Sequence, residues 1–114
     1  MRKKSRGIFK KDKSKELSKD EIIKILTKNR KILGKFKVKR IGIFGSFVRN
    51  KATSKSDVDL YVEFEEPTLE NFIGLSSTLE KLFKRKVDIL TPLGIESIRI
   101  PSVKEEIKKS IEYV

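Results

Sequence analysis

Residues 41–62 place the tightest constraint on what this chain can fold into. An apolar run at the start of the stretch predicts a buried strand, and Gly45-Ser46 breaks that strand where the backbone has to approach something closely. Asp57 and Asp59 follow and open a second strand. Because side chains alternate between the faces of a strand, both carboxylates point to the same side. The stretch therefore predicts two strands, joined by a turn and a loop, with a pair of aspartates facing one way.

The composition is that of one heavily charged domain. The chain has 114 residues, of which 39% are charged and 37% hydrophobic, so a single domain with a modest core is expected. No apolar run approaches the roughly 20 residues that span a bilayer, and the first residues do not resemble a signal peptide. We therefore expect a soluble, cytoplasmic protein that does not associate with a membrane.

The sequence contains no cysteine and no histidine. Disulfides, thiolate nucleophiles, zinc sites of the usual kind and imidazole acid-base catalysis are excluded together. Any chemistry must come from carboxylates, hydroxyls, amines and a hard metal ion.

The positive charge is concentrated in the first third of the chain. Residues 1–40 hold 17 Lys and Arg against 4 Asp and Glu, whereas residues 41–114 hold 11 against 12, and the whole chain carries +12. Residues 1–17 have few apolar groups and predict a flexible basic arm ahead of a domain over residues 18–114. The arm would steer the domain toward RNA, a nucleotide or an acidic protein, or it is a solubilising tail without a specific partner.

The first half of the domain predicts a helix and two strands. Ser18 and Glu21 form a capping box that begins a helix, and Gly34 is its expected end. Alternating and then continuous apolar residues predict strands over 36–44 and 58–64.

The second half predicts two helices around one strand. Thr68 is positioned to cap a long helix with a broad apolar face, and a short strand over 87–91 follows. Pro92 and Gly94 end that strand and begin an irregular piece, after which a capping box at Ser102 predicts a last helix over about 103–113. The expected fold is α+β, with a short mixed sheet of about three strands packed with helices.

A third aspartate, Asp88, lies between apolar residues in the last predicted strand. If this strand pairs with the one carrying Asp57 and Asp59, three oxygen ligands converge. Mg²⁺ or Mn²⁺ fits such ligands, and two ions would activate an attacking oxygen and stabilise a leaving pyrophosphate. Gly45-Ser46 would hold nucleotide phosphates through its backbone N–H groups and hydroxyl.

Each of these residues also has an ordinary structural explanation. Gly45-Ser46 alone is a common turn, Asp57 can cap a loop, and Asp88 can pair with a neighbouring lysine on an edge strand. Arg49 either binds phosphate or ties the loop to a carboxylate. Tyr61 and Glu63 share the side of the aspartates and are expected to border the site.

The combined pattern resembles the minimal nucleotidyltransferases of the DNA polymerase β superfamily, the MNT or MntA-like family. The resemblance covers about residues 18–114 and rests on Gly45-Ser46 after an apolar strand, the Asp57-x-Asp59 pair, and the later Val-Asp-Ile-Leu-Thr-Pro segment. Members commonly have a small residue, Arg and Gly after the turn. This chain has Val-Arg-Asn, and Asn50 preserves the turn because asparagine tolerates left-handed backbone.

The resemblance implies transfer of AMP from ATP to a hydroxyl. It further implies that Gly45 and Ser46 contact the nucleotide phosphates, and that the three aspartates bind metal, one of them helping to deprotonate the acceptor. Arg49 is the third candidate for nucleotide binding, with both explanations given above still open. Small members are frequently antitoxins that AMPylate a HEPN-domain toxin, so a HEPN-type partner is expected. Two alternatives stay open: a non-catalytic module of the same fold that binds a partner, and RNA-directed nucleotidyl transfer, which the basic arm favours.

Overall fold

The computed structural model describes residues 17–53 and 55–114. The predicted arm over residues 1–17 therefore lies outside the described residues except for Leu17, which packs against the core. In the described part of the chain, no helix is both long enough and apolar enough to cross a membrane.

A four-stranded mixed sheet in the order β3-β2-β1-β4 forms the centre of the molecule. The strands are β1 (Val38–Phe44), β2 (Val58–Phe64), β3 (Val87–Leu90) and β4 (Glu112–Tyr113). β1 pairs antiparallel with both β2 and β4, whereas β2 and β3 run parallel. The parallel pair requires a long crossover, which the 15-residue helix α4 (Leu69–Phe83) supplies. The predicted mixed sheet is confirmed, with a fourth strand of two residues.

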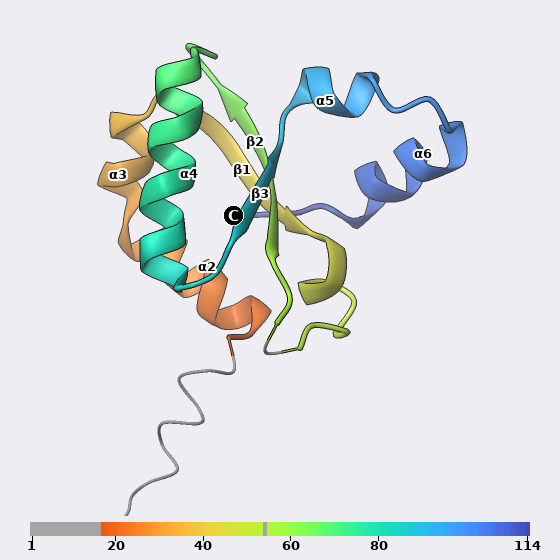
Figure 1. The fold of residues 1–114 in the computed structure, drawn as a ribbon, viewed down its shortest axis with the longest axis horizontal. Coiled ribbons are helices and arrows are strands. Elements are labelled where there is room, and N and C mark those ends of the chain that lie inside the picture. The colour runs from red at the N-terminus through yellow and green to blue at the C-terminus, as the bar shows by residue number, and fades with distance from the viewer. Residues whose placement is uncertain (1–16, 54) are drawn as a thin grey trace, which may run out of the picture.

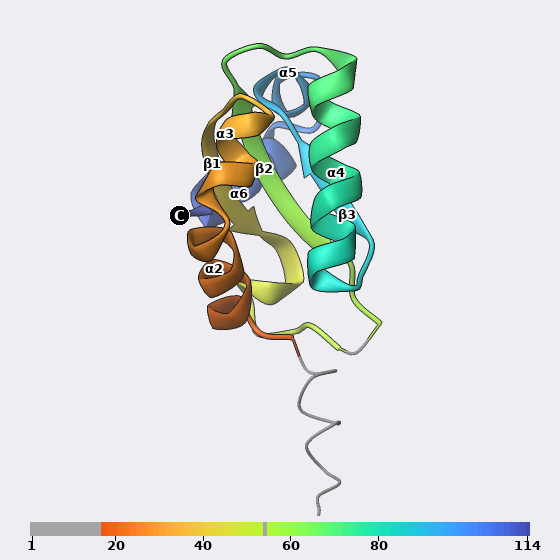
Figure 2. The same ribbon diagram turned by 90° about the vertical axis from the view of Figure 1, so that its left-hand side faces the viewer.

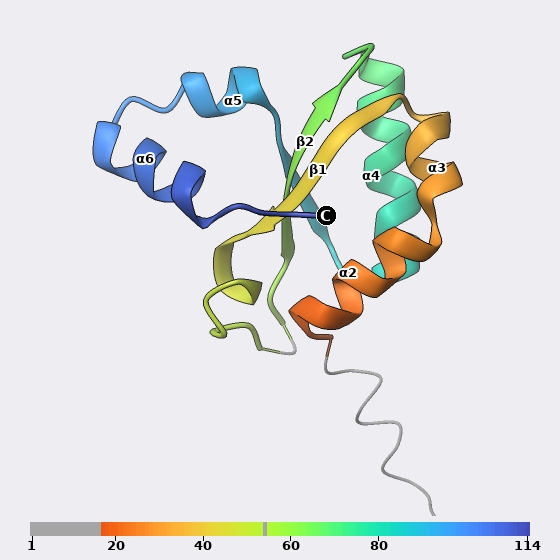
Figure 3. The same cartoon turned by 180° about the vertical axis from the view of Figure 1, so that it is seen from behind.

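The helices lie in two groups on opposite sides of the sheet (Figures 1 and 3). α4 lies with α2 (Lys19–Lys28) and α3 (Arg30–Lys35) on one side, where Figure 2 shows them in front of the strands. α5 (Pro92–Glu96) and α6 (Pro101–Ser110) lie on the other. Within residues 17–53 and 55–114, the sheet therefore has one closely covered face and one face that is approached only by α5 and α6.

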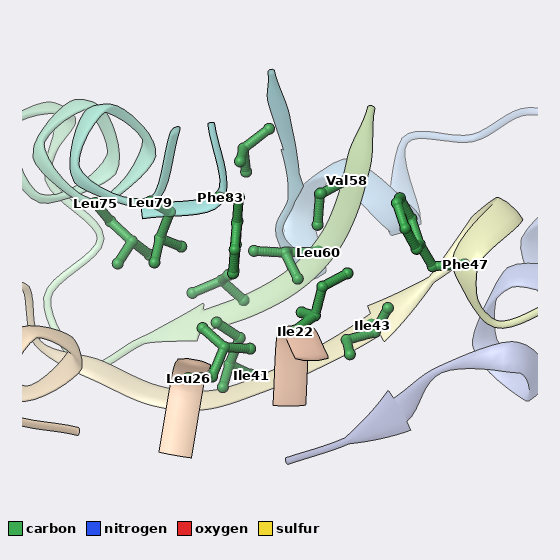
Figure 4. Close-up of a cluster of buried hydrophobic side chains, with 12 residues drawn as sticks. Ile22, Leu26, Ile41, Ile43, Phe47, Val58, Leu60, Leu75, Leu79 and Phe83 are labelled. Carbon is green, nitrogen blue, oxygen red and sulfur yellow. The ribbon is translucent and has the colours of Figure 1, made fainter. Parts of the chain in front are cut away.

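The hydrophobic core fills the space between the sheet and the first group of helices (Figure 4). Alternate residues of β1 and β2 point into it, as the period of two along a strand requires. Its buried members are Ile22, Leu26, Ile41, Ile43, Phe47, Val58, Leu60, Val62, Leu75, Leu79, Phe83 and Val87. The intervening residues of β2, which include the aspartate, must then point to the opposite face.

Ser18 and Thr68 cap their helices as predicted, although only the serine's half of the capping box at Ser18 is present, and the first predicted helix is broken. The Ser18 hydroxyl accepts from the Glu21 backbone N–H, and Thr68 caps α4 through the Asn71 N–H. Instead of continuing to Gly34, the first helix stops at Asn29, whose φ of −110° and ψ of 36° lie outside the helical region. The Asn29 side chain donates to the Ile25 carbonyl at 2.7 Å, a local bond that competes with helix continuation.

The C-terminal predictions were wrong in three respects. The segment predicted as irregular contains α5, which the Thr91 hydroxyl caps through the Gly94 N–H. α6 begins at Pro101 rather than at the Ser102 capping box, because proline presets the backbone at the first position of a helix. α6 also ends at Ser110, and the last predicted helical residues form β4.

Candidate active site

Gly45 brings the end of β1 against the carboxylate of Asp59. Its φ is +81°, a region that L-residues rarely adopt, and a Cβ atom placed on it would overlap the Asp59 side chain. A short 3₁₀ helix, η1 (Gly45–Phe47), follows immediately. Glycine is therefore required at position 45 for two reasons: its positive φ, and the closeness of the Asp59 carboxylate, which leaves no room for a Cβ atom.

The parallel pairing of β2 and β3 places Asp59 directly opposite Asp88. The predicted adjacency of the two strands is thus present, and the aspartates share one face because directly paired residues point to the same side of a sheet. Asp57 precedes β2, is exposed, and acts electrostatically on Asp59. Asp59 and Asp88 therefore lie side by side on the open face, and Asp57 is near enough to Asp59 to act on its charge.

Burial raises the pKa of the Asp59 carboxyl above its ordinary value, and repulsion from Asp88 and then Asp57 raises it further. Attraction to Arg49 opposes these effects. Among the described residues, none of the three aspartates forms an ion pair within 4.0 Å. The aspartates therefore form a cluster of negative charge that is not fully compensated.

This cluster has the chemistry of a site for a hard divalent cation, because carboxylate oxygens are what Mg²⁺ and Mn²⁺ prefer. No three acidic side chains of the described residues are arranged as a ready-made metal cage. Mg²⁺ usually takes one or two carboxylates and completes its shell with water and substrate phosphates. The residues therefore fit a cation that binds together with a phosphorylated ligand.

The loop between η1 and β2 is held at both ends. Asn50 has a φ of 57°, so the left-handed turn predicted for this residue is confirmed. Near the other end, Arg85 donates to the carbonyls of Thr53 and Ser56 at 2.9 and 3.0 Å. The second of these bonds holds the peptide that leads directly into Asp57.

A cleft of about 270 Å³ opens beside Asp59, between the ends of β1 and β2 and helix α6. Its lining residues are Phe44, Gly45, Arg49, Asp59, Val103, Glu106, Ile107 and Ser110. Three of the six predicted site residues thus line one cavity. Asp57 and Asp88 act on Asp59 from outside this lining, and Ser46 lies in η1, where its carbonyl accepts from the Lys51 N–H.

Helix α6 contributes to this cleft in a way that the sequence did not predict. Val103 and Ile107 stand four residues apart and therefore lie on the same side of a helix that is otherwise largely polar and charged. That spacing is a usable signal for an apolar stripe, but it does not reveal what the stripe covers. Nothing in the local sequence marks Glu106 or Ser110 as cleft residues, because their position depends on how α6 folds back.

Tyr61 and Glu63 continue the open face of β2 beyond Asp59. The buried Tyr61 hydroxyl donates to Glu63 at 2.7 Å, and burial together with this carboxylate raises the pKa of Tyr61 to about 12. Arg40 donates to the same Glu63 oxygen at 2.8 Å and lies 4.2 Å from the ring centre of Tyr113. These residues form a closed polar network that braces β1, β2 and β4 together.

The chain is similar to known proteins over most of its length. The family model described as "Nucleotidyltransferase domain" matches residues 19–114. A protein of Methanocaldococcus jannaschii named "Putative protein adenylyltransferase MJ1379" is 43% identical over 98 residues, which cover 82% of this chain and 95% of that protein. "Protein adenylyltransferase MntA" of Thermococcus cleftensis is 42% identical over 100 residues, covering 86% and 97%.

Solved structures share the fold. "Structure of putative minimal nucleotidyltransferase" superposes with a TM-score of 0.60 at 26% identity and covers 80% of this chain and 93% of that one. "Crystal structure of the toxin-antitoxin with AMP-PNP" has a TM-score of 0.56 at 20% identity and covers 85% and 72%. At 20% identity, the second likeness concerns the fold alone.

Proposed function

The chain belongs to the nucleotidyltransferase domain family, and on this premise we propose that it transfers AMP from ATP to a hydroxyl group of a protein. We propose further that the acceptor is a HEPN-type toxin, for which this chain is the antitoxin. The observation that carries the proposal is the meeting of three features at one place. Gly45 touches Asp59, Asp59 stands opposite Asp88, and Arg49 lines the same cleft as Asp59.

The division of charge in the site suits a nucleoside triphosphate. The turn at Gly45-Ser46 and the guanidinium of Arg49 would bind phosphate oxygens, since backbone N–H groups and arginine are good phosphate donors. Asp57, Asp59 and Asp88 would hold Mg²⁺ or Mn²⁺ against those phosphates. Bound divalent ions, two in this class of site, would neutralise the charge that develops on the leaving pyrophosphate.

The transfer itself replaces one P–O bond by another. The acceptor hydroxyl oxygen attacks the α-phosphorus, a new O–P bond forms, and the bond to the β-phosphate oxygen breaks as pyrophosphate departs with the electron pair. The hydroxyl proton goes to a carboxylate. Asp59 is a candidate for this task because its carboxylate lines the cleft in which the nucleotide would bind.

Similar proteins support the choice of a protein acceptor and of an adenine nucleotide. One relative is named "Putative protein adenylyltransferase MJ1379" and another "Protein adenylyltransferase MntA", and a protein of the same fold was crystallised as a toxin–antitoxin with AMP-PNP. The small size of the domain supports a partner-supplied acceptor, because no second lobe of this chain encloses a small-molecule substrate among the described residues.

The test combines the purified chain with labelled ATP, Mg²⁺ and a HEPN-type toxin encoded beside it. We expect label on the toxin, and a decrease of about 100-fold or more in the rate for Asp57→Asn/Asp59→Asn, because electrostatic stabilisation of the transition state is lost. The matched control, Glu70→Gln/Glu105→Gln, also neutralises two carboxylates but leaves the cleft lining unchanged. Chelation of the metal should stop transfer in every variant that is active.

Two results would contradict the proposal. Label transfer that survives the double aspartate substitution would exclude the mechanism. Tight binding of the toxin without any label transfer would favour the non-catalytic binding module instead.

A further inference from the structure

Helix α6 is amphipathic, yet none of its residues, all of which the structure describes, is buried. Its apolar residues Val103 and Ile107 line the cleft beside Asp59 instead of packing into the core, and Val103 remains 40% exposed. An apolar pair that faces a cavity next to a polar site requires an explanation, because packing into the core would bury it more completely.

We propose that α6 holds the nucleoside half of the nucleotide, with the base lying on Val103 and Ile107. The proposal rests on the proposed function, because it assigns the remaining part of the same substrate. On this proposal α6 contributes to nucleotide affinity in addition to the glycine, serine and aspartates at the strand ends.

A neighbouring side of α6 is tied to α5, which limits how α6 can rotate about its axis and so holds this apolar pair toward the cleft. Lys104 and Lys108 form ion pairs with the two carboxylate oxygens of Glu96 in α5, at 3.2 and 3.3 Å. β4 follows α6 directly and pairs with β1. α6 is thus held at both ends without a core of its own, and its cleft-facing side stays available to a ligand.

The lining residues come from two parts of the fold with different chemistry. Gly45, Arg49 and Asp59 belong to the strands and to the segment after β1, and they suit phosphates and a cation. Glu106 and Ser110 belong to α6. The carboxylate of Glu106 would repel a phosphate, whereas a carboxylate and the Ser110 hydroxyl can both accept hydrogen bonds from ribose hydroxyls. The residues of α6 therefore fit the uncharged part of the nucleotide.

The apolar surface fits a base. Phe44 joins Val103 and Ile107 in the lining, and a purine or pyrimidine presents a flat π-face to such residues. The cleft volume of about 270 Å³ lies just below the range of roughly 300–1,000 Å³ typical of ligand pockets. A nucleotide would accordingly occupy the cleft with part of its phosphates extending toward Asp57 and Asp88.

The test compares two ligands on the full chain in the presence of Mg²⁺: a non-hydrolysable ATP analogue and inorganic triphosphate. In Val103→Ser/Ile107→Ser we expect binding of the ATP analogue to weaken about tenfold or more, because each lost apolar contact costs at least that order. Triphosphate binding should stay unchanged. The control variant Leu69→Ser/Ile73→Ser alters a pair with the same spacing on α4, where both residues are exposed, and should bind both ligands normally.

A second measurement does not depend on the variants. Amide hydrogen exchange of α6 in the unmodified protein should slow when the ATP analogue binds and should not slow with triphosphate. If the α6 double variant fails to fold, the difference in α6 amide exchange between the two ligands is by itself sufficient to test the inference.

Several outcomes would overturn the inference. Equal loss of both ligands would mean that the pair only supports the cleft, and unchanged binding of both would remove α6 from the nucleotide site. Normal binding of the ATP analogue combined with slower transfer to the toxin would assign the pair to the acceptor. A wild-type chain that binds neither ligand would contradict the proposed function itself, which is a different result from any of these.

Discussion

At the scale of single residues, Gly45 and Asp59 depend on each other. The positive φ of Gly45 and the Asp59 carboxylate beside it both exclude a side chain. Gly45→Ala should therefore lower the free energy of unfolding by at least about 1–2 kcal/mol, the cost of a left-handed non-glycine residue. It should also displace Asp59 and reduce nucleotidyl transfer. Urea unfolding and the labelling assay measure the two effects.

Gly34 provides the control for this substitution. It lies within α3, and a Cβ atom on it would meet nothing within 4 Å. Gly34→Ala should raise the free energy of unfolding by about 0.5–1 kcal/mol, since alanine is the better helix former. A similar response to alanine at both positions would contradict the role given to Gly45.

Glu63 should make the stability of the protein depend on acid pH. Hydrogen bonds from Tyr61 and then Arg40 lower the pKa of its carboxyl below the ordinary 4.5. The ionised form is therefore favoured by folding, and its contribution is complete above pH 4.5 and disappears as the pH falls through the lowered pKa. Glu63→Gln should cost about 1 kcal/mol at pH 7 and progressively less below pH 4.5.

The measurement is urea unfolding of Glu63→Gln and wild type between pH 7 and pH 3. The exposed Glu105 on α6 serves for comparison, and Glu105→Gln should change stability little at any pH. A loss in Glu63→Gln that is the same at pH 3 as at pH 7 would show that packing, and not ionisation, is responsible.

Residue spacing predicted the strand part of the site because the spacing itself carries the geometry. Alternation along β2 places Asp59 opposite the core residues Val58 and Leu60, and a glycine between an apolar strand and a loop indicates a close approach. Asp57 precedes β2, so the same alternation does not fix where its side chain points. The positions of Glu106 and Ser110 depend on how a distant helix folds back over the sheet. No local pattern encodes that placement.

At the scale of elements, β4 depends on Gly42 in β1. A Cβ atom on Gly42 would collide with the Ile111 side chain and lie 3.1 Å from the Glu112 carbonyl oxygen. Gly42→Ala should therefore weaken the pairing of β1 with β4, at a cost of about 1–3 kcal/mol for an overpacked site. Because β4 directly follows α6, nucleotide binding should weaken as well.

Amide exchange separates the local effect from a global one. In Gly42→Ala, the backbone amide of Val114, which donates to the Ile41 carbonyl at 2.9 Å, should exchange much faster than the amides of α4. Uniform acceleration throughout the chain, or no acceleration at Val114, would contradict the assignment of Gly42 to the docking of β4.

Helices and strands with a clear periodic pattern and flanking turn or capping residues were predicted well, and elements that lack such a pattern were not. β2 was predicted with its observed bounds, since it combines alternation with flanking turn residues. β4 has two residues and no periodic pattern of its own, so only its pairing with β1 defines it. The capping-box pattern at Ser102 was misleading because the proline just before it fixed an earlier helix start.

At the scale of the whole molecule, the basic charge and the predicted site lie in different parts of the sequence. Residues 1–40 carry a net +13, and the predicted site residues all belong to the remainder, which carries −1. Deleting residues 1–16 should therefore leave the unfolding temperature close to that of wild type, because Leu17 and the core stay intact. The rate of AMP transfer to a protein acceptor should stay within about twofold of the wild-type rate.

The labelling assay, run on the full chain and on the deletion variant with and without added RNA, measures the effect of the deletion on transfer. RNA-dependent activity that vanishes with residues 1–16 would favour the nucleic-acid alternative. Loss of transfer to the toxin on the same deletion would show that the arm guides the protein acceptor.

The parallel pairing of β2 with β3 also has a consequence for how fast the chain folds. Asp59 and Asp88 become neighbours only when α4 has crossed the sheet and β3 has paired, so the closing of this long loop brings like charges together. Salt shortens the range of that repulsion, and a divalent ion held between the two carboxylates would offset it. We therefore expect the sheet to close slowly in dilute buffer and faster with Mg²⁺. The two facing aspartates that would bind a cation in the folded protein would thus also make the cation speed the folding of the sheet.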